Sequence, residues 1–415
     1  MKKIVILSPD TVALPLKDVH PATIREGSRE YPIEDKCQKM AAIGKRSWRF
    51  AEYLSKHNDF DVTLLVPDVN FPPKEFIDTS KINFKVDSYN FKLANWEWSD
   101  ELDRKLKNAD FVIVQTVTGT GFLNSAVLPR SVNVIIDGWV PFLAELPCVL
   151  LSYPRIYRKI HWTTKFLPQY KDMLTRANCI LYANARQQYY YEGQFFMMEK
   201  LDWTAFKFSP LLKIPYGVDK LNQIQQKNDT STLSLLWYGP IYPWYFPEIL
   251  IEQLANVDNI KIDFIGVRHP RYQRIYNTYY KKFFDTVAST SNMTVVEDYD
   301  YKLDQVELFQ KYDAGIIIAR NWLEETYSHR CRILEMASAG LPVIVNKGNS
   351  LYEESECLKP LLHTVSLENI KEDILQLANN KQKLNVTAEQ VNNVHYELNW
   401  EKVLNPLVEY IRKFS

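Results

Sequence analysis

The sequence has few cysteines, no excess of charge and no long apolar segment, and each absence excludes a class of protein. Its five cysteines are scattered and none forms a C-x-x-C pair, so neither a disulfide framework nor a zinc site is expected. Lys and Arg together number 50, as do Asp and Glu, and the resulting net charge of zero argues against a bulk nucleic-acid binder. No apolar run reaches the roughly 18 residues of a membrane-spanning helix.

No targeting signal is expected from the N-terminal residues. The apolar run at residues 4–7 is too short for a secretory signal peptide, and Pro9 and Asp10 stop it. A reducing cytosol fits the cysteine usage best. We therefore expect a cytoplasmic protein. At 415 residues the chain exceeds the usual size of one hydrophobic core, and we expect two domains.

Short β-branched apolar runs alternate with helical patterns in both halves of the chain. The strands expected in the first half are residues 4–7, 61–67, 84–86, 111–115, 132–137 and 179–183, and residues 213–218 close this half. The strands expected in the second half are residues 233–239, 260–266, 293–297, 314–319 and 341–345. Strands without polar alternation, separated by helices, indicate parallel sheets covered on both faces. The fold class predicted is α/β, with two Rossmann-like domains.

A polar stretch at residues 222–231 indicates the linker between the halves. We predict an N-terminal Rossmann-like acceptor domain over residues 1–216 and a C-terminal Rossmann-like donor domain over residues 217–395. Residues 396–415 form a final segment whose amphipathic helix packs either on its own half or back on the first.

Ligands of open parallel sheets bind beyond the carboxyl ends of the strands, and two such ends in the first half carry candidate residues. Gly44 stands at the start of a predicted helix, where backbone N–H groups attract anions, although a lone glycine as often only makes a turn. Asp137 ends a predicted strand and is followed by Gly138 and two aromatic residues. A role in the cleft and a role as a helix cap or turn residue are equally favoured for this carboxylate.

The third strand end, at residues 320–345, combines the most features. A buried strand leads into a loop rich in Glu and Arg, and then into a helix whose first turn carries Ser328, Arg330 and Arg332. Amides at such a helix start bind a diphosphate, and an arginine adds charge-assisted hydrogen bonds. Glu335, one or two turns further on, is placed to accept hydrogen bonds from a ribose. The alternative is a salt-bridged surface helix.

This third segment resembles the C-terminal signature of retaining GT-B glycosyltransferases of the family-four type. The run Glu335-Met336-Ala337-Ser338-Ala339-Gly340-Leu341-Pro342-Val343 matches the second half of that signature. The first glutamate departs from it, because Glu324 lies eleven positions before Glu335 instead of eight. The longer spacing is similar to that of bacterial polysaccharide and lipopolysaccharide glycosyltransferases, which Tyr327-Ser328 and Arg330-x-Arg332 also fit.

Other segments resemble the same subgroup, so the likeness covers most of the chain. They are the glycine loop at Gly239, the Arg-Gln-rich run at residues 185–193, the Asp137–Glu145 segment, and Gly44 with Arg46. The resemblance implies a nucleotide-sugar donor held mainly by the C-terminal half, transfer with retention, and no obligatory metal or other cofactor. The D-x-D spacing of Asp298 and Asp300 is read as a loop.

The resemblance implies roles for particular residues. Glu324 lies near the hydroxyls of the donor sugar, Arg330 or Arg332 stabilises the departing charge, and Asp137 orients the acceptor or the sugar. The catalytic residues expected are Glu324, Asp137 and Arg330. The donor-binding residues expected are Gly44, Arg46, Gly239, Tyr327, Ser328, Arg330, Arg332 and Glu335.

The acceptor is expected to be a glycan, a lipid-linked molecule or a small molecule, and not a nucleic acid. The basic, aromatic stretch at residues 153–166 suits contact with an anionic membrane, and a solvated helix with its aromatics in the core is the favoured alternative. Two rival functions stay open: a non-catalytic GT-B partner or scaffold, and another sugar-nucleotide enzyme on the same fold. No G-x-G-x-x-G follows the first strand, so a dehydrogenase is not expected.

Overall fold

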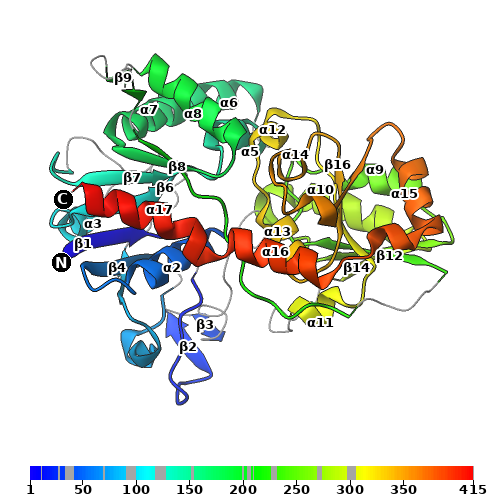
Figure 1. The fold of residues 1–415 in the computed structure, drawn as a ribbon, viewed down its shortest axis with the longest axis horizontal. Coiled ribbons are helices and arrows are strands. Elements are labelled where there is room, and N and C mark those ends of the chain that lie inside the picture. Colours follow the sequence, from blue (N-terminus) through cyan, green and yellow to red (C-terminus); the bar gives the residue numbers. More distant parts are fainter. Residues whose placement is uncertain are drawn as a thin grey trace. The chain divides into compact units, whose positions relative to one another are not determined.

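The structure is a computed structural model, and it describes residues 1–10, 12–26, 29–32, 42–68, 71–89, 100–116, 128–150, 154–198, 201–202, 207–208, 210–225, 231–268, 273–296 and 305–414. The chain divides into two compact units (Figure 1). Unit 1 comprises Met1–Phe142, Arg155–Tyr216 and Val403–Ser415, and unit 2 comprises Leu143–Pro154 and Gly217–Lys402. Residues 143–154 thus group with unit 2, and the C-terminal segment groups with unit 1 only from Val403.

Unit 1 is built on a seven-stranded sheet in the order β11-β8-β7-β6-β1-β4-β5, in which every neighbouring pair is parallel. Its strands are β1 (Lys2–Leu7), β4 (Phe60–Pro67), β5 (Lys85–Tyr89), β6 (Phe111–Gln115), β7 (Asn133–Asp137), β8 (Cys179–Tyr182) and β11 (Leu211–Lys213). Two small antiparallel pairs lie outside the sheet: β2 (Thr23–Glu26) with β3 (Arg29–Pro32), and β9 (Leu201–Asp202) with β10 (Lys207–Phe208).

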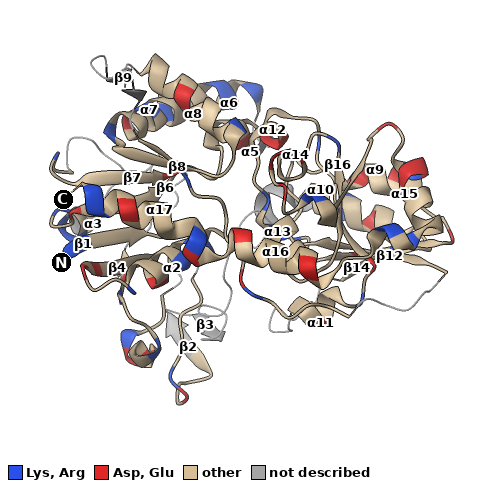
Figure 2. Cartoon of the chain, in the orientation of Figure 1, with Lys and Arg blue, Asp and Glu red and all other residues tan. Residues whose placement is uncertain are grey.

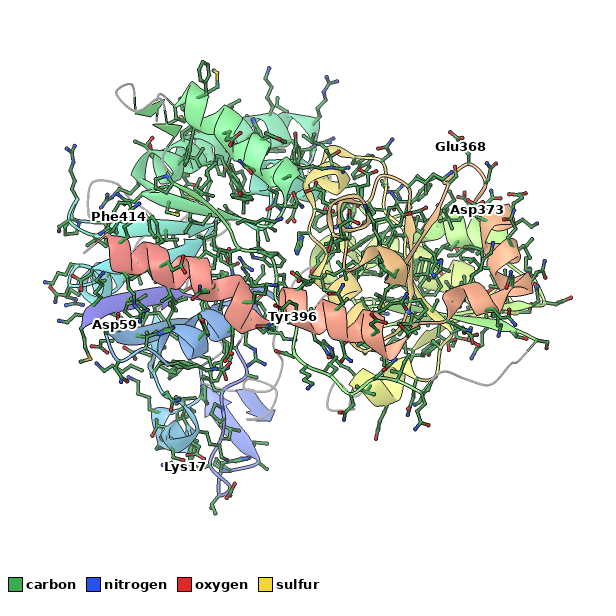
Figure 3. All side chains as sticks on the ribbon, viewed as in Figure 1. Lys17, Asp59, Glu368, Asp373, Tyr396 and Phe414 are labelled. Atoms are coloured by element: carbon green, nitrogen blue, oxygen red, sulfur yellow. The ribbon has the colours of Figure 1, made fainter. Side chains whose placement is uncertain are left out.

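The helices of unit 1 connect these parallel strands. They are α2 (Ala42–Leu54), η2 (Lys74–Phe76), η3 (Thr79–Lys81), α3 (Asp100–Leu106), α6 (Arg155–His161), the π-helix η4 (Trp162–Phe166), α7 (Leu167–Arg176) and α8 (Ala185–Met197). The C-terminal helix α17 (Trp400–Lys413) joins unit 1 from Val403 onward. Its end is held there because the Lys2 Nζ donates to the Ile411 carbonyl at 2.5 Å, and Arg412 pairs with Asp59, labelled in Figure 3.

Unit 2 is built on a six-stranded sheet in the order β14-β13-β12-β15-β16-β17, again with every pair parallel. Its strands are β12 (Leu233–Tyr238), β13 (Ile260–Ile265), β14 (Met293–Val296), β15 (Ala314–Ile317), β16 (Val343–Asn346) and β17 (Leu362–Val365). Its helices are α5 (Phe142–Leu150, from Leu143), α9 (Pro247–Leu254), α10 (Gln273–Ala288), α11 (Gln305–Phe309), α12 (Leu323–Tyr327), α13 (Cys331–Ser338), α14 (Ser350–Glu354), η5 (Lys359–Leu361), α15 (Ile370–Asn379), η6 (Lys381–Leu384) and α16 (Ala388–Leu398).

The burial of the central strands explains why both sheets form. All residues of β6, β15 and β16 are buried, as expected of parallel strands covered by helices on both faces. The predicted α/β fold class is therefore confirmed within each unit. Among the described residues, no helix is long and apolar enough to cross a membrane.

Candidate functional site

The order of the unit 2 sheet determines where a ligand would bind. Strand β12 pairs with β13 on one side and with β15 on the other, so the chain leaves the carboxyl ends of β12 and β15 in opposite directions. Such a switch point is where ligands of open α/β sheets bind. The loops that follow the two strands are joined here, because the Phe246 N–H donates to the Ile318 carbonyl at 2.9 Å and the Arg320 N–H donates to the Trp244 carbonyl at 2.7 Å.

Gly239 follows β12 at this switch point, where both the backbone conformation and the space available disfavour any residue with a side chain. Its φ is +94°, a conformation that L-side chains rarely adopt. A Cβ atom at this position would also lie 3.2 Å from the guanidinium carbon of Arg332. The Arg332 Nη1 donates a hydrogen bond of 2.9 Å to the carbonyl of the next residue, Pro240. The predicted glycine loop therefore allows an arginine of α13 to pack closely against its backbone.

A cluster of aromatic rings follows Gly239 and supports the arginines. The guanidinium carbons of Arg330 and Arg332 lie 4.6 and 4.8 Å from the ring centroid of Tyr245. Tyr242 stacks on Trp244, with ring centroids 4.7 Å apart and planes 11° from parallel. Cations over aromatic faces are stabilised by the ring quadrupole, most strongly where water is excluded. The Tyr245 ring thus holds two positive charges beside each other.

Arg330 is the centre of a buried charge network. Its Nη2 donates to Glu324 at 2.7 Å and also to Glu325, and its Nε donates to Glu325 at 3.0 Å. Asn349, which follows β16, donates to the other oxygen of Glu325 at 3.0 Å, and its own oxygen accepts from backbone N–H groups at the start of α14. The exposed fractions of Glu324, Glu325 and Arg330 are 2%, 5% and 6%. Buried charges of this kind are kept only when they are paired and hydrogen-bonded.

The helix after β15 begins later than the sequence suggested. A short helix, α12, ends at Tyr327, and α13 begins at Cys331 with Arg330 as its N-cap. Ser328, predicted in the first helical turn, is instead the C-cap of α12. Its hydroxyl donates to the Glu325 carbonyl at 3.2 Å, and its carbonyl accepts from the Ser350 hydroxyl at 2.5 Å. The two consecutive carboxylates cause this difference, because pairing them with Arg330 requires a turn between the two helices.

The two arginines differ in how their charge is compensated. The charge of Arg330 is offset by two carboxylates. Within the part of the chain that the structure describes, Arg332 makes no ion pair, and its guanidinium donates to the uncharged Pro240 carbonyl. Arg332 stands in the first turn of α13, where the helix dipole also favours anions. Arg332, rather than Arg330, is therefore the cation best placed to bind an anionic ligand.

A third carboxylate, Glu145 of α5, interacts electrostatically with this network. The pKa of Glu145 is raised to about 8, mainly by burial and then by the negative charge of Glu324, while Arg330 opposes the shift. Burial also raises the pKa of Glu324 to about 7, against the opposing effect of Arg330. Because the two carboxyl groups influence each other, the pair shares its titration. Near neutral pH the pair therefore retains a proton that ordinary carboxylates lose.

In unit 1, the predicted site residues Arg46 and Asp137 bind each other. Two Arg46 nitrogens donate to the two Asp137 oxygens, each at 2.8 Å. Arg46 also donates to the carbonyls of Ile214 and Pro215, and its guanidinium lies 4.8 Å from the ring centroid of Phe50. The exposed fractions of Arg46 and Asp137 are 0% and 1%. Burial raises the pKa of Asp137, and the charge of Arg46 opposes that shift.

This pairing joins two of the predicted unit 1 residues to each other. Both oxygens of Asp137 accept from Arg46, so the pair positions α2 against the end of β7, and contact of either side chain with a ligand stays a prediction. Gly44 does not precede a helix as expected. It is the third residue of α2, and it is buried. The Gln115 side chain, at the end of β6, donates to the Ile43 carbonyl at 3.2 Å, which puts the start of α2 at the carboxyl edge of the sheet.

Apart from Gly239, the candidate residues of the second half lie on one segment in unit 2. Glu324, Arg330 and Arg332 are joined through the network and the Tyr245 ring, while Tyr327 and Glu335 are partly exposed on the same pair of helices. Glu325, Asn349 and Tyr245 were not predicted from the sequence. The doubled glutamate and the aromatic run after Gly239 were visible signals for two of them. Asn349 carried no signal, since its contact with Glu325 depends on the pairing of β15 with β16.

No group of three or more His, Cys, Asp or Glu side chains within the described residues could hold a metal ion. Asp298 and Asp300, whose spacing resembles a metal motif, lie outside the described residues.

Comparisons with known proteins show the fold. No protein-family model matches the chain, and no curated protein matches its sequence. Solved structures do match over the whole length. Sucrose-phosphate synthase of Thermosynechococcus elongatus has a TM-score of 0.66 at 12% identity, covering 100% of this chain and 99% of that one. HepE of Anabaena in complex with UDP-glucose has a TM-score of 0.59 at 12% identity, covering 100% of both chains.

OtsA in its apo form is a third match, with a TM-score of 0.60 at 8% identity and 99% coverage of both chains. These structures have the GT-B glycosyltransferase fold, and the chain shares it. The predicted GT-B fold class is confirmed, and at these identities the likeness is one of fold.

The Arg46–Asp137 pair gives a stability test. Replacing Asp137→Ala leaves a buried guanidinium without its counter-charge, so we expect the free energy of unfolding to fall by about 3–5 kcal/mol in urea denaturation. The matched control is Asp172→Ala on the exposed face of α7, which should change it by less than about 0.5 kcal/mol. An Asp137→Ala protein as stable as the parent would contradict the positioning role.

The raised pKa values of Glu145 and Glu324 give a pH test. The native state holds protons that unfolded glutamates release above about pH 4.5, so the free energy of unfolding should fall as pH rises from about 4.5 to about 8. Glu145→Gln removes one of the two carboxyl groups that cause this fall in stability. The melting temperature of the variant minus that of the parent should therefore increase with pH, by on the order of a few degrees. Thermal unfolding from pH 5 to pH 8 measures this, with exposed Glu372→Gln as the control; parallel curves for parent and Glu145→Gln would refute the assignment.

Proposed function

We propose that the chain is a glycosyltransferase that moves a sugar from a nucleotide-sugar donor to an acceptor hydroxyl, with retention at the anomeric carbon. The observation that carries the proposal is the position of Arg332. This cation stands in the first turn of α13, at the switch point of the unit 2 sheet, and it makes no ion pair with a carboxylate among the described residues. A helix start combined with an arginine binds the diphosphate of a nucleotide sugar.

The neighbouring side chains support the same ligand. The stacked pair Tyr242 and Trp244 follows Gly239 and supplies flat apolar surface near the arginines. Partly exposed Glu335 stands one turn into α13, where a ribose would bring hydroxyl groups. The Anabaena protein that shares the fold has been solved with UDP, with UDP and glucose, and with UDP-glucose, and donors of this kind are proposed for this chain.

The proposed chemistry assigns a task to each charged residue. The bond between the anomeric carbon and the diphosphate oxygen breaks, the acceptor oxygen forms the new bond to the anomeric carbon, and the acceptor proton passes to the departing diphosphate. Arg332 and the amides at the start of α13 stabilise the charge that develops on the departing diphosphate. Because these groups supply positive charge at the leaving group, the proposal includes no metal ion. Glu324 accepts a hydrogen bond from the donor sugar, and Arg330 fixes its position.

Nucleotide-sugar binding tests the proposal. Melting temperatures measured with UDP-, GDP-, ADP- and dTDP-sugars should rise with at least one donor, because a ligand of the native state stabilises it. Arg332→Ala should bind that donor roughly 10- to 100-fold more weakly, the loss expected for a hydrogen bond to a charged group. Exposed Lys371→Ala on α15 is the matched control and should bind normally.

Two outcomes would count against the proposal. The absence of a shift with every donor would remove the nucleotide-sugar site. Binding without consumption of the donor, when glycan, lipid-linked and small-molecule acceptors are supplied, would favour a non-catalytic relative of the fold.

A further inference from the structure

Helix α6 of unit 1 carries a cluster of exposed apolar side chains. Ile156, Tyr157 and Ile160 have exposed fractions of 68%, 55% and 47%. Their spacing of one and four positions puts them on one side of the helix. Among the described residues eleven large apolar side chains are exposed, and three of them fall within five residues here. Single exposed apolar residues are ordinary, but a group of this kind indicates a contact surface.

The charge around this cluster has a single sign. Residues 146–171 contain Arg155, Arg158, Lys159, Lys165 and Lys171 but no Asp or Glu, in a chain whose total numbers of cations and anions are equal. Arg155 and Lys159 are exposed on α6 itself, and Figure 2 shows the Lys and Arg positions on this helix. The partner of the surface must therefore be negatively charged as well as able to receive apolar side chains.

The length of the element limits what this surface can bind. Helix α6 has seven residues and continues into η4 and α7, whose Tyr170 and Met173 are buried in unit 1. The short exposed segment is thus held by a buried anchor, and nothing on it is long enough to enter a bilayer deeply. A basic face interleaved with isoleucine and tyrosine is the composition of segments that lie in the headgroup region of anionic membranes.

We infer that α6 docks the protein on an anionic lipid surface. Ile156, Tyr157 and Ile160 enter the boundary between headgroups and acyl chains, and Arg155 and Lys159 bind the headgroup phosphates. The inference does not depend on the donor site of unit 2. Docking would, however, bring a transferase to acceptors that are linked to lipid.

Vesicle cosedimentation tests this inference with the full chain. The parent protein should sediment with vesicles of phosphatidylcholine and phosphatidylglycerol, and much less with phosphatidylcholine alone. The double variant Arg155→Ala with Lys159→Ala should partition roughly 30-fold less into anionic vesicles, at about 1 kcal/mol per cation. The double variant Ile156→Ser with Ile160→Ser should lose about tenfold or more, because buried methylene groups are removed.

Matched controls separate this surface from general charge and apolarity. Lys281→Ala with Lys282→Ala removes two exposed cations from α10, and Val19→Ser with Tyr396→Ser removes two exposed apolar side chains from other surfaces. Both controls should bind like the parent. Parent protein that fails to bind anionic vesicles, or α6 variants that bind as the parent does, would overturn the inference. So would a change of oligomeric state caused by the α6 variants without lipid, since the surface would then be a protein interface. Unchanged thermal unfolding of each variant shows that the loss reflects binding.

Discussion

The pairing of Arg330 with Glu324 and Glu325 is the interaction on which the unit 2 site depends. It joins segments that follow three strands, because Tyr245 follows β12, the carboxylates follow β15 and Asn349 follows β16. Arg330 cannot leave the network without leaving two buried carboxylates without their counter-charge, which favours the observed turn between α12 and α13. That arrangement brings Arg332 over Tyr245 and against Gly239. Arg332, which we propose binds the donor, is thus positioned by Arg330, for which we propose no contact with the donor.

Unit 1 also contains a buried arginine paired with a carboxylate, at the end of strand β7. Arg46 is entirely buried and holds both oxygens of Asp137, with two backbone carbonyls completing its hydrogen bonds. A carboxylate at the end of a β-strand looks catalytic in the sequence, yet here it balances the charge of an arginine from a neighbouring helix. The comparison separates two kinds of arginine at strand ends. Arg46 and Arg330 satisfy their charge within the protein, whereas Arg332 lacks a carboxylate partner among the described residues.

Much of the fold could be predicted from the sequence, because buried parallel strands are short, apolar and β-branched. The strands predicted at residues 111–115 and 260–266 lie within a residue of their observed ends. Helices α10, α15 and α16 were missed, since their exposed polar faces lacked the apolar runs used to find elements. The segment at residues 320–345 could be proposed as the site from the sequence, but its charges were assigned without their partners. Which arginine pairs with which carboxylate depends on the turn after Tyr327 and on Asn349, and local sequence patterns specify neither.

The central claim is that the start of α13 and the Arg332 guanidinium bind the phosphates of a nucleotide. A crystal structure of the protein with the nucleoside diphosphate that binds most tightly tests it directly. The account predicts a phosphate oxygen within hydrogen-bond distance of Arg332 and of backbone N–H groups at the first turn of α13, with Arg330 still paired to its two glutamates. A diphosphate bound elsewhere, or this helix start covered by protein atoms, would contradict it.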